Sequence, residues 1–390
     1  MSITKILYVY ANNYEVGGAD YCLFKMVYEM NQLGYETIVL LSKHTSIVEL
    51  YKKHNLRVLI KPILRFQKTS NPLKLINYLF GFCRSIIFIS RLIKEYQIDI
   101  VHSNDLLDFT ANISAKLTRV ISVQHIRMIV KGVLKVFLRK ISLRFSDQVL
   151  AVSNGLKDLM FHKKDFKVIV LYDWIDVDLV GHNNITSNIR EELHINSDIK
   201  IIGCVGRLEH WKGQHVLIEA ARIVIKKYEK CVFLIVGGTV KGKETYLHEL
   251  KKLVSNYKLE DKIYFLGERK DIANLFHQFD FSVHCSVEPD PLPGIVLESL
   301  VNNCVIIGAN GGGVPEEIDI DSTGLLYEPK NYIELSEKIL FLLNNEDKLS
   351  EMKALTSNSV LRKYDKKKIV TELNSIYRAL LNTKLRKCNY

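Results

Sequence analysis

The chain has 390 residues, of which 47% are hydrophobic and 25% charged, a composition typical of globular proteins rather than of disordered or fibrous chains. One hydrophobic core rarely serves more than about 250–300 residues, so the length favours two domains. The seven cysteines are scattered and form no CxxC pair, which argues against a disulfide framework or a zinc site and fits a reducing cytosol.

The net charge of +11 lies almost entirely in the first half of the chain, where residues 51–150 hold 18 Lys and Arg against 5 Asp and Glu. This asymmetry predicts that the first half meets an anionic partner. The longest uncharged apolar run, LINYLFGFC, is far shorter than the roughly 18 residues that span a bilayer, so we expect no membrane-crossing segment. The N-terminal residues lack the apolar core and cleavage site of a signal peptide and are expected to form a first strand.

Short runs rich in Val and Ile recur along the chain, separated by segments of helix length, in two successive sets. This pattern predicts two parallel sheets, each covered by helices on both faces. The first set of predicted strands is 3–10, 36–41, 57–61, 98–103, 119–124, 147–152 and 167–172, and the second is 199–206, 232–238, 262–267, 280–285, 304–309 and 324–327.

A polar, Asn-rich segment at 182–198 separates the two sets and predicts a domain boundary near residue 185. We therefore expect domains at 1–184 and 185–365, with 366–390 forming a charged amphipathic helix that packs back on the first domain. Ligands of open α/β sheets bind outside the carboxyl ends of the strands, which predicts a site in a cleft between the two domains.

The stretch VGRLEHWKG places two cations between a predicted strand and a predicted helix. Gly206 ends the strand, and Arg207 and Lys212 follow before the helix opens at Gly213. A guanidinium and an ammonium near a helix N-terminus can hold a departing diphosphate through charge-assisted hydrogen bonds. The alternative for these two residues is a pair of solvated surface cations.

The stretch SVEPDPLPGIVLESL holds acidic residues across a proline-rich turn, whose three prolines within 289–293 fix the backbone. Glu298 lies about one turn inside a helix expected to begin near Gly294. The free N–H groups of that helix can hold a phosphate, while the carboxylate accepts hydrogen bonds from a diol such as ribose. The alternatives are a helix-capping acid for Asp290 and a solvated helix face for Glu298.

The order GRL…KG, FLG, an acidic pair across a proline-rich turn, GGVPE and TGLLY resembles the nucleotide-sugar domain of the retaining GT-B glycosyltransferases of family 4. The resemblance implies an α/β fold of two Rossmann-like domains whose parallel sheets face each other across a cleft. The E-x7-E signature of that family corresponds here to Asp290, implied to be catalytic, and Glu298, implied to bind the donor. Because Pro293 stands where the family usually has Gly, the phosphate-facing amides would be those of Gly294 and Ile295.

The first half matches the family at short islands that follow predicted strands. The element GGAD, with Gly17 and Gly18, is similar to the glycine pair that approaches the donor diphosphate, although a turn is the simpler explanation of such glycines. The resemblance also implies that His125 reaches the donor sugar and the reacting centre, whereas a lone strand-end histidine is more often structural. His102 and Asp105 are candidates for the acceptor side. The dinucleotide fingerprint GxGxxG is absent.

The predicted chemistry needs no metal or other cofactor, because Arg207, Lys212 and helix N-termini can neutralise the leaving diphosphate of a UDP- or GDP-sugar. The triplets at 176–178 and 319–321 imitate the metal-binding DxD motif, and we interpret both as chance. The resemblance implies that the anomeric configuration of the transferred sugar is retained.

Two basic stretches, 127–144 and 81–96, are predicted to form amphipathic helices. Each alone fits a core helix with a solvated face, but both lie in the basic half of the chain, which favours binding to anionic lipid. No nucleic-acid-binding motif is present. The basic residues concerned are Arg127, Lys131, Lys135 and Arg139 in the first stretch, and Arg84, Arg91 and Lys94 in the second.

Together these features predict a bacterial glycosyltransferase that adds a sugar to a hydroxyl of a lipid-linked or lipopolysaccharide- or capsule-type glycan. It would be a cytoplasmic protein, peripheral on the inner leaflet of the cytoplasmic membrane. Two alternatives remain: a non-hydrolysing nucleotide-sugar epimerase on the same two-domain plan, and a catalytically inactive sugar-nucleotide-binding partner.

Overall fold

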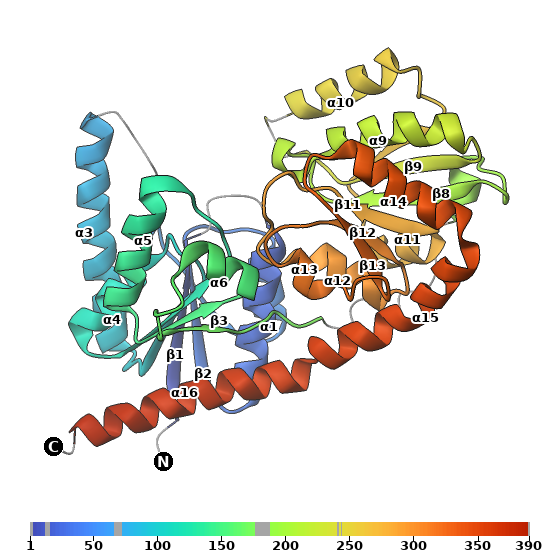
Figure 1. The fold of residues 1–390 in the computed structure, drawn as a ribbon. Coiled ribbons are helices and arrows are strands. Elements are labelled where there is room, and N and C mark those ends of the chain that lie inside the picture. The colour runs from blue at the N-terminus through green and yellow to red at the C-terminus, as the bar shows by residue number, and fades with distance from the viewer. Residues whose placement is uncertain are drawn as a thin grey trace. The chain divides into compact units, whose positions relative to one another are not determined.

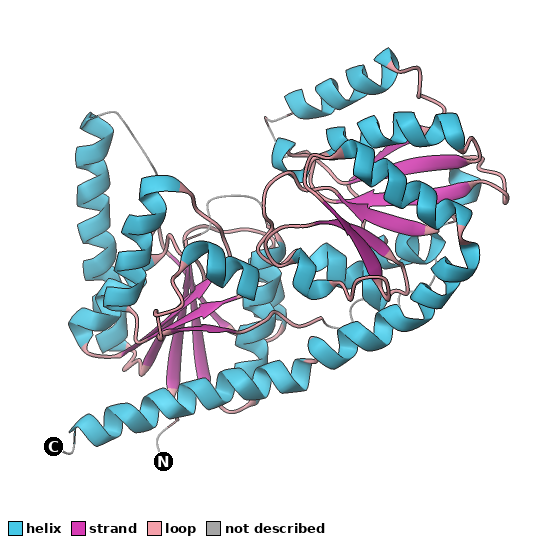
Figure 2. Cartoon of the chain, viewed as in Figure 1, coloured by secondary structure: helices cyan, strands magenta, loops and turns pink. Residues whose placement is uncertain are grey.

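The structure is a computed structural model that describes residues 3–11, 16–65, 72–175, 188–239, 242 and 244–388. The chain divides into two compact units, one formed by Met1–Asp173 with Lys367–Tyr390 and the other by Trp174–Lys366. Each unit holds one parallel sheet flanked by helices (Figures 1 and 2). The boundary predicted near residue 185 falls in 176–187, outside the described residues.

Unit 1 is built on a seven-stranded sheet with the order β3-β2-β1-β4-β5-β6-β7, and all its neighbouring strands are parallel. The strands are β1 (Lys5–Tyr10), β2 (Glu36–Leu41), β3 (Arg57–Ile60), β4 (Ile100–Ser103), β5 (Ile121–Ile126), β6 (Gln148–Ala151) and β7 (Val168–Val170). The helices are α1 (Gly18–Gln32), α2 (Ile47–Lys53), α3 (Pro72–Glu95), α4 (Phe109–Thr118), α5 (Gly132–Phe145), α6 (Asn154–Met160) and α16 (Lys366–Cys388).

Side chains alternate across this sheet, as strand geometry requires. Leu7 and Val9 of β1 join a buried cluster with residues of α3 and α4. Tyr8 points to the opposite face, where its hydroxyl lies 3.3 Å from that of Tyr377 on α16. The hydroxyl of Tyr35 also donates to the Asn374 side chain of that helix at 2.7 Å. The C-terminal helix is therefore part of unit 1.

Unit 2 is built on a six-stranded parallel sheet with the order β10-β9-β8-β11-β12-β13. The strands are β8 (Lys200–Val205), β9 (Cys231–Val236), β10 (Ile263–Gly267), β11 (Phe281–His284), β12 (Ile306–Ala309) and β13 (Gly324–Tyr327). The helices are α8 (Ile189–Glu192), the single 3₁₀ turn η1 (His210–Lys212), α9 (Gln214–Lys227), α10 (Thr245–Asn256), α11 (Ile272–Gln278), α12 (Gly294–Val301), α13 (Val314–Glu317), α14 (Tyr332–Asn344) and α15 (Glu346–Lys363).

Both faces of this second sheet are buried. Ile202 and Cys204 of β8 pack with α9, α10 and α14 in one cluster, while Ile201 of the same strand packs with α11 on the other face. Strands covered on both sides need nearly continuous apolar runs, and this explains why their sequence signal is strong. The thirteen strands of the described residues coincide with the thirteen predicted runs, and the predicted α/β class with two parallel sheets is confirmed.

One predicted helix is placed differently. The stretch 127–144 was expected to be helical throughout, but α5 begins at Gly132, where a positive φ of 68° turns the chain into the helix. Arg127 lies before this turn, and its guanidinium is buried against the carboxylate of Asp173. Arg139, within α5, forms a two-pronged contact with Asp165. Both arginines are thus engaged inside unit 1, so the prediction that they face a lipid surface is wrong.

The helix α3 also differs from expectation. Among the described residues, the segment Ile76–Glu95 is the one helix long and apolar enough to cross a membrane by length and composition, and only a small part of it is buried. Arg84 and Arg91 interrupt its uncharged run, although the helix as a whole stays apolar. The expectation that no segment crosses a membrane was based on uncharged runs and therefore did not consider this helix.

Candidate functional site

The loop between β8 and α9 holds Lys212 in a fixed position. Gly213, which precedes α9, adopts a left-handed conformation with φ of 72°, and a Cβ there would lie 1.9 Å from the carbonyl oxygen of Cys285. Only glycine permits this close approach to the segment after β11. On the other side of the loop, the Cys285 thiol contacts the carbonyl of Lys212 at 3.2 Å. The loop is therefore held against the carboxyl end of β11.

Lys212 meets Asp290 at this edge of the sheet. The ammonium Nζ lies 2.5 Å from Oδ2 of Asp290, and both side chains are largely buried, with 17% and 8% exposed. The backbone of Asp290 is fixed as well, because its carbonyl accepts from the N–H of Gly313 at 2.8 Å. Gly312 has a φ of 63° and a Cβ there would clash with the same carbonyl at 1.9 Å. The carboxylate and the ammonium form a pre-organised ion pair.

Two further titratable side chains surround this pair. Nε2 of His284, at the end of β11, lies 3.4 Å from Oδ2 of Asp290 and 3.0 Å from the hydroxyl of Ser286. Glu317, in α13, is 97% buried. Its carboxyl is electrostatically coupled to Asp290.

The protonation states of this cluster follow from its burial. Burial raises the pKa of Asp290, but the Lys212 ammonium and His284 outweigh it and hold that pKa well below its usual value. Burial lowers the pKa of His284, although Asp290 opposes the shift. Burial and the charge of Asp290 raise the pKa of Glu317 well above its usual value. The cluster therefore combines Asp290, whose charged form is favoured, with a His284 ring and a Glu317 carboxyl whose charged forms burial disfavours.

The helix α12 follows the proline-rich turn and begins at Gly294, as predicted. Within the described part of the chain no side chain caps it, and Gly294 is exposed. A Cβ on Gly294 would lie 3.8 Å from Oε1 of Glu298, so the Glu298 carboxylate lies beside the first turn. The first turn of α12 thus places the amides of Gly294 and Ile295 close to this carboxylate, the arrangement that the predicted donor site requires.

Arg207 is placed more loosely than Lys212. Its side chain is 52% exposed and lies 3.3 Å from the carboxylate of Glu209, which also accepts from the indole N–H of Trp211 at 3.1 Å. The Lys212 ammonium stacks on the Trp211 ring at 4.1 Å from its centroid. Because Arg207 is half exposed, it also fits the alternative of a solvated surface cation. The buried Lys212 does not fit that alternative.

In unit 1, the predicted glycines precede α1. Gly17 is its N-cap residue, and its N–H donates to the Asp20 carboxylate at 2.9 Å. Among the atoms of the described residues, a Cβ on Gly17 or Gly18 would meet none within 4 Å. No described side chain therefore crowds the first turn of α1, as the approach of a ligand to the helix N-terminus would require.

His125 and His102 lie on neighbouring strands, with ring centroids 5.6 Å apart, and both are fully buried. Nδ1 of His125 lies 3.3 Å from the Arg127 guanidinium. Burial, together with the positive charge of Arg127, lowers the pKa of His125 well below its usual value and that of His102 to about 3. Nδ1 of His102 is bonded to the Tyr377 hydroxyl at 2.6 Å, so His102 anchors α16.

Asp105 forms an ion pair with Arg65 and accepts from the backbone N–H of Leu106 at 2.6 Å. Burial raises its pKa, although Arg65 opposes the shift. The neighbouring carboxyl of Asp108 is fully buried, and burial together with Asp105 raises its pKa well above the usual value. The two acceptor-side candidates, His102 and Asp105, are thus occupied by contacts within unit 1.

Three residues were not assigned to these clusters from the sequence. His284 ends a predicted strand just as His102 and His125 do, and the same criterion would have found it. Glu317 follows Glu316 directly in GGVPEEI, and nothing in the sequence distinguishes the buried acid from its half-buried neighbour. Arg127 was placed in a helix because its spacing to Lys131 matched a helical repeat.

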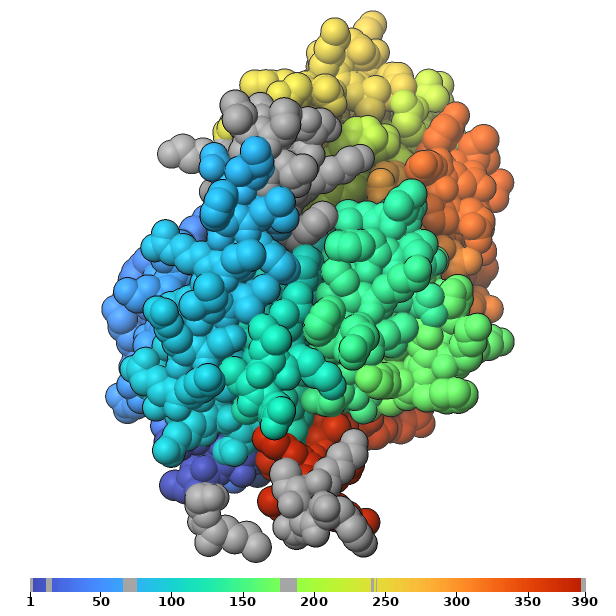
Figure 3. Space-filling view, turned by 90° about the vertical axis from the view of Figure 1, so that its left-hand side faces the viewer, coloured from blue at the N-terminus to red at the C-terminus, as the bar shows by residue number. Residues whose placement is uncertain are grey.

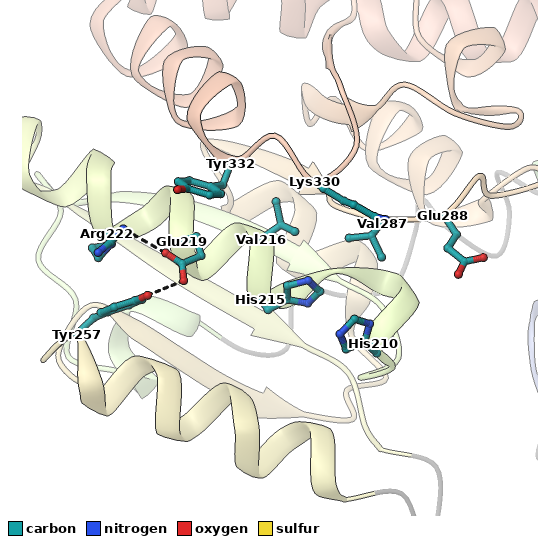
Figure 4. Close-up of a pocket in the computed structure, with 10 residues that line it drawn as sticks. All are labelled: His210, His215, Val216, Glu219, Arg222, Tyr257, Val287, Glu288, Lys330 and Tyr332. Carbon is teal, nitrogen blue, oxygen red and sulfur yellow. Dashed lines mark hydrogen bonds and ion pairs between the residues drawn. The ribbon is translucent and has the colours of Figure 1, made fainter.

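A cavity of about 670 Å³ lies elsewhere in unit 2, along α9 (Figure 4). None of the predicted donor-binding residues lines it. Its lining residues are His210, His215, Val216, Glu219, Arg222, Tyr257, Val287, Glu288, Lys330 and Tyr332. Three of these side chains are already engaged with one another, because Glu219 accepts from Tyr257 at 2.5 Å and pairs with Arg222 at 3.3 Å. Among the described residues, no group of His, Cys, Asp and Glu could hold a metal ion.

Comparison with known proteins gives the family. Residues 186–358 match the family described as Glycosyl transferases group 1, and residues 16–179 match the family described as Glycosyltransferase Family 4. N-acetyl-alpha-D-glucosaminyl L-malate synthase of Bacillus anthracis is 25% identical over 60% of this chain and 59% of its own length. An uncharacterized glycosyltransferase of Methanocaldococcus jannaschii is 26% identical over 72% of this chain and 73% of its own.

Solved structures share the whole fold. A glycosyltransferase of Rickettsia africae is similar with a TM-score of 0.83 and 23% identity, covering 98% of this chain and 99% of its own. Anabaena Alr3699/HepE, solved in complex with UDP and glucose, is similar with a TM-score of 0.81 and 20% identity, covering 96% and 99%. With a family match on each sheet and the same fold throughout, the chain belongs to the GT-B glycosyltransferases of family 4, group 1.

Proposed function

We propose that this glycosyltransferase transfers a sugar from a nucleoside diphosphate sugar, with retention of configuration and without a metal, to a hydroxyl of a lipid-linked or lipopolysaccharide- or capsule-type glycan. The observation that carries the proposal is the buried Lys212–Asp290 pair at the carboxyl edge of the unit 2 sheet, beside the uncapped start of α12. The UDP and glucose bound by Alr3699/HepE, which has the same fold, support a nucleotide-sugar donor.

In the proposed donor complex, the diphosphate meets Lys212, Arg207 and the amides of Gly294 and Ile295, while Glu298 accepts from the ribose hydroxyls. These groups are aimed at charge that develops as the bond between the sugar and the diphosphate breaks, which is how a pre-organised site lowers a barrier. The Lys212 ammonium already lies in position, so little reorganisation is needed at the moment of reaction.

Asp290 has a second role in this proposal. Its carboxylate is ionised and bound to Lys212, and it is one methylene shorter than the glutamate usual at this position. We assign it to holding Lys212 and accepting from a donor-sugar hydroxyl. We also assign His125 of unit 1 a role as a neutral hydrogen-bonding group, since burial disfavours its charged form. The acceptor hydroxyl attacks from the face that the diphosphate leaves.

The first test is binding. The full chain is mixed with UDP-, GDP- and ADP-sugars, and its thermal unfolding is followed. A donor present at 100 times its Kd adds about 2.7 kcal/mol to the free energy of unfolding. The stabilised sample identifies the base, and loss of that stabilisation in Lys212→Ala, but not in a variant of exposed Lys226 on α9, locates the donor.

The second test separates the proposal from the epimerase of the same fold. The enzyme is incubated with the stabilising nucleotide sugar alone and the sugar is followed by NMR. A transferase leaves the sugar's stereochemistry unchanged and hydrolyses the donor slowly. Conversion to a second nucleotide sugar would establish the epimerase, and binding without any turnover in the presence of glycan acceptors would establish the inactive partner.

A further inference from the structure

Two helices of unit 1 expose large apolar side chains to solvent. In α3, Phe80 is 72% exposed and three further apolar residues of the same helix are more than half exposed; in α5, Val133 is 87% exposed. Single exposed apolar residues are ordinary, but a group on two helices marks a contact surface. We call this group the apolar tip; it consists of Ile76, Leu79, Phe80 and Ile87 of α3 and Val133, Val136 and Phe137 of α5.

The apolar tip lies on one side of unit 1. Both α3 and α5 pack against α4, and the face that Figure 3 turns to the viewer carries both helices, α3 in light blue and α5 in green. Each of the two helices follows a strand of the parallel sheet, β3 or β5, so each begins at the carboxyl edge of that sheet. Gly17, Gly18 and His125 lie at that same edge. The apolar tip is therefore on the side of unit 1 where the proposed acceptor must arrive.

Cations follow the apolar residues along both helices. On α3, the stripe that begins with Ile76 and Phe80 continues at intervals of three and four residues to Arg84, Arg91 and Lys94, all exposed. On α5, the stripe of Val133, Val136 and Phe137 continues to exposed Lys140 and Arg144. Each helix thus presents an apolar first half and a basic second half. Among the described residues, no acidic partner pairs with Arg84, Arg91 or Lys140.

We propose that the apolar tip enters the interface of an anionic lipid membrane, with the cations behind it on the lipid headgroups. An apolar surface edged by cations matches an interface whose interior is apolar and whose surface is negative. The net charge of the region supports a lipid partner, since residues 51–150 hold 18 basic and 5 acidic residues. A second copy of the chain would bring these like charges together and is disfavoured.

This arrangement also accounts for the hydropathy of α3. The helix is long and apolar enough to span a bilayer, but Ile89, Leu92 and Ile93 in its second half are packed in the core of unit 1 with β1, β2 and α4. Because the second half of α3 packs in the core of unit 1, only its first half is available to contact lipid. The hydropathy signal therefore arises from an interfacial helix and not from a membrane span.

The proposal refines the proposed function by naming the lipid-binding surface. It rests on that function only in that a lipid-linked acceptor explains why the protein binds a membrane. The test is flotation of the purified full chain with vesicles that contain phosphatidylglycerol and with vesicles of phosphatidylcholine alone. Phe80→Asp is expected to weaken binding to the anionic vesicles about tenfold or more, because it places a charge where an aromatic ring should enter lipid. Arg84→Gln with Arg91→Gln is expected to weaken it by a similar factor and to reduce its salt dependence.

Phe166→Asp is the matched control. Phe166 is 91% exposed in the same unit but directly precedes β7, at the opposite edge of the sheet. It should bind vesicles as the wild type does. Equal binding by wild type and Phe80→Asp, or an equal loss in Phe166→Asp, would overturn the assignment of the surface. If the protein stayed in the vesicle membrane after an alkaline wash, the interfacial assignment would be overturned and α3 would be a membrane-spanning helix.

Donor binding is measured in the same samples by thermal stabilisation. The substituted side chains are exposed and far along the chain from the unit 2 cluster, so Phe80→Asp should keep the donor response of the wild type. Loss of vesicle binding with an intact donor response supports the surface. Vesicle binding by a chain that no nucleotide sugar stabilises would leave the surface standing and refute the proposed function.

Discussion

The two units share one doubly wound plan, and each buries an ion pair at the carboxyl edge of its sheet, Lys212–Asp290 in unit 2 and Arg65–Asp105 in unit 1, but the pKa values of the two aspartates shift in opposite directions. In unit 2, Lys212 and Asp290 form an ionised pair at the edge of the sheet, and Asp290 keeps a pKa well below its usual value despite burial. In unit 1, His102 and His125 are buried neutral rings, and burial raises the pKa of Asp105. The Asp290 carboxylate thus keeps its charge in the buried unit 2 cluster, whereas burial disfavours the charged forms of Asp105 and of both histidines in unit 1.

The difference arises from what covers each edge. A Cβ at Gly213 or Gly312 would collide with the opposite backbone, so these glycines let two loops close around a cation and a carboxylate. In unit 1 the histidines lie under Arg127 and the C-terminal helix, whose positive charge and bulk disfavour a second cation. Removing the Lys212 charge should therefore have the largest effect on activity, because this ion pair lies at the proposed donor site.

The largest effect is expected for Lys212→Ala. This change removes a cation from the proposed diphosphate site and leaves Asp290 buried without its partner, so we expect kcat/KM to fall about 1,000-fold, or roughly 4 kcal/mol. The free energy of unfolding should fall by about 3 kcal/mol, because breaking a buried ion pair leaves an uncompensated charge. Steady-state kinetics and urea unfolding measure the two effects, with exposed Lys226→Ala as the control. Normal kinetics in a destabilised Lys212→Ala would make the pair structural.

A smaller effect on turnover is expected for His125→Asn. If His125 assists the reacting centre from unit 1, kcat should fall about 100-fold while stabilisation by the nucleotide sugar stays as in the wild type. Asn keeps a hydrogen-bonding group of similar reach, which limits damage to the core. A parallel loss of donor stabilisation would place His125 in donor binding, and unchanged kcat would leave it a core residue packed on His102.

Arg207→Ala is expected to lower kcat/KM by about 10- to 100-fold, since one charged hydrogen bond contributes about 1.5–3 kcal/mol. The side chain is half exposed, so little change in stability should accompany the loss. Arg207→Lys should recover part of the activity, because it restores the charge but not the two-pronged geometry. Activity within twofold of wild type would remove Arg207 from the site and leave Lys212 as its cation.

The sequence predicted the strands better than it predicted the site. Strands buried on both faces must be apolar throughout, and that constraint is visible in every one of them. The partners of a charge depend on tertiary contacts, which local spacing does not record. Arg127 and Arg139 fall at four-residue intervals typical of a helix face, yet they bind Asp173 and Asp165, and that spacing carries no information about those acids.

The site shows the same division. Lys212, Asp290, Gly294 and Glu298 were predicted from the chain order of their motifs, and in the structure Lys212 contacts Asp290 while Gly294 lies beside Glu298. His284 and Glu317 were missed because their importance comes from a distance and from burial. A strand-end histidine can be noticed from the sequence, but the buried member of an adjacent glutamate pair cannot.

The smallest activity effect, and a diagnostic stability effect, is expected for Glu317→Gln. Burial and Asp290 raise the pKa of Glu317 well above its usual value, so the folded protein keeps this carboxyl protonated to a higher pH than the unfolded chain, which releases its proton above about pH 4.3. Unfolding is therefore favoured increasingly as pH rises from about 5 toward the folded-state pKa, by up to about 1.4 kcal/mol per pH unit. Glutamine has the shape of the protonated acid and does not titrate.

The variant should accordingly be more stable than the wild type, and its advantage should be larger at pH 8 than at pH 5. Urea unfolding at both pH values measures the difference, and Glu337→Gln, an exposed glutamate on α14, serves as the control that should show no such trend. An advantage that is constant with pH would mean that Glu317 is ionised in the folded protein. In that case two carboxylates, those of Asp290 and Glu317, would repel a diphosphate at this edge of unit 2. The single positive charge of Lys212 could not make the edge a donor site.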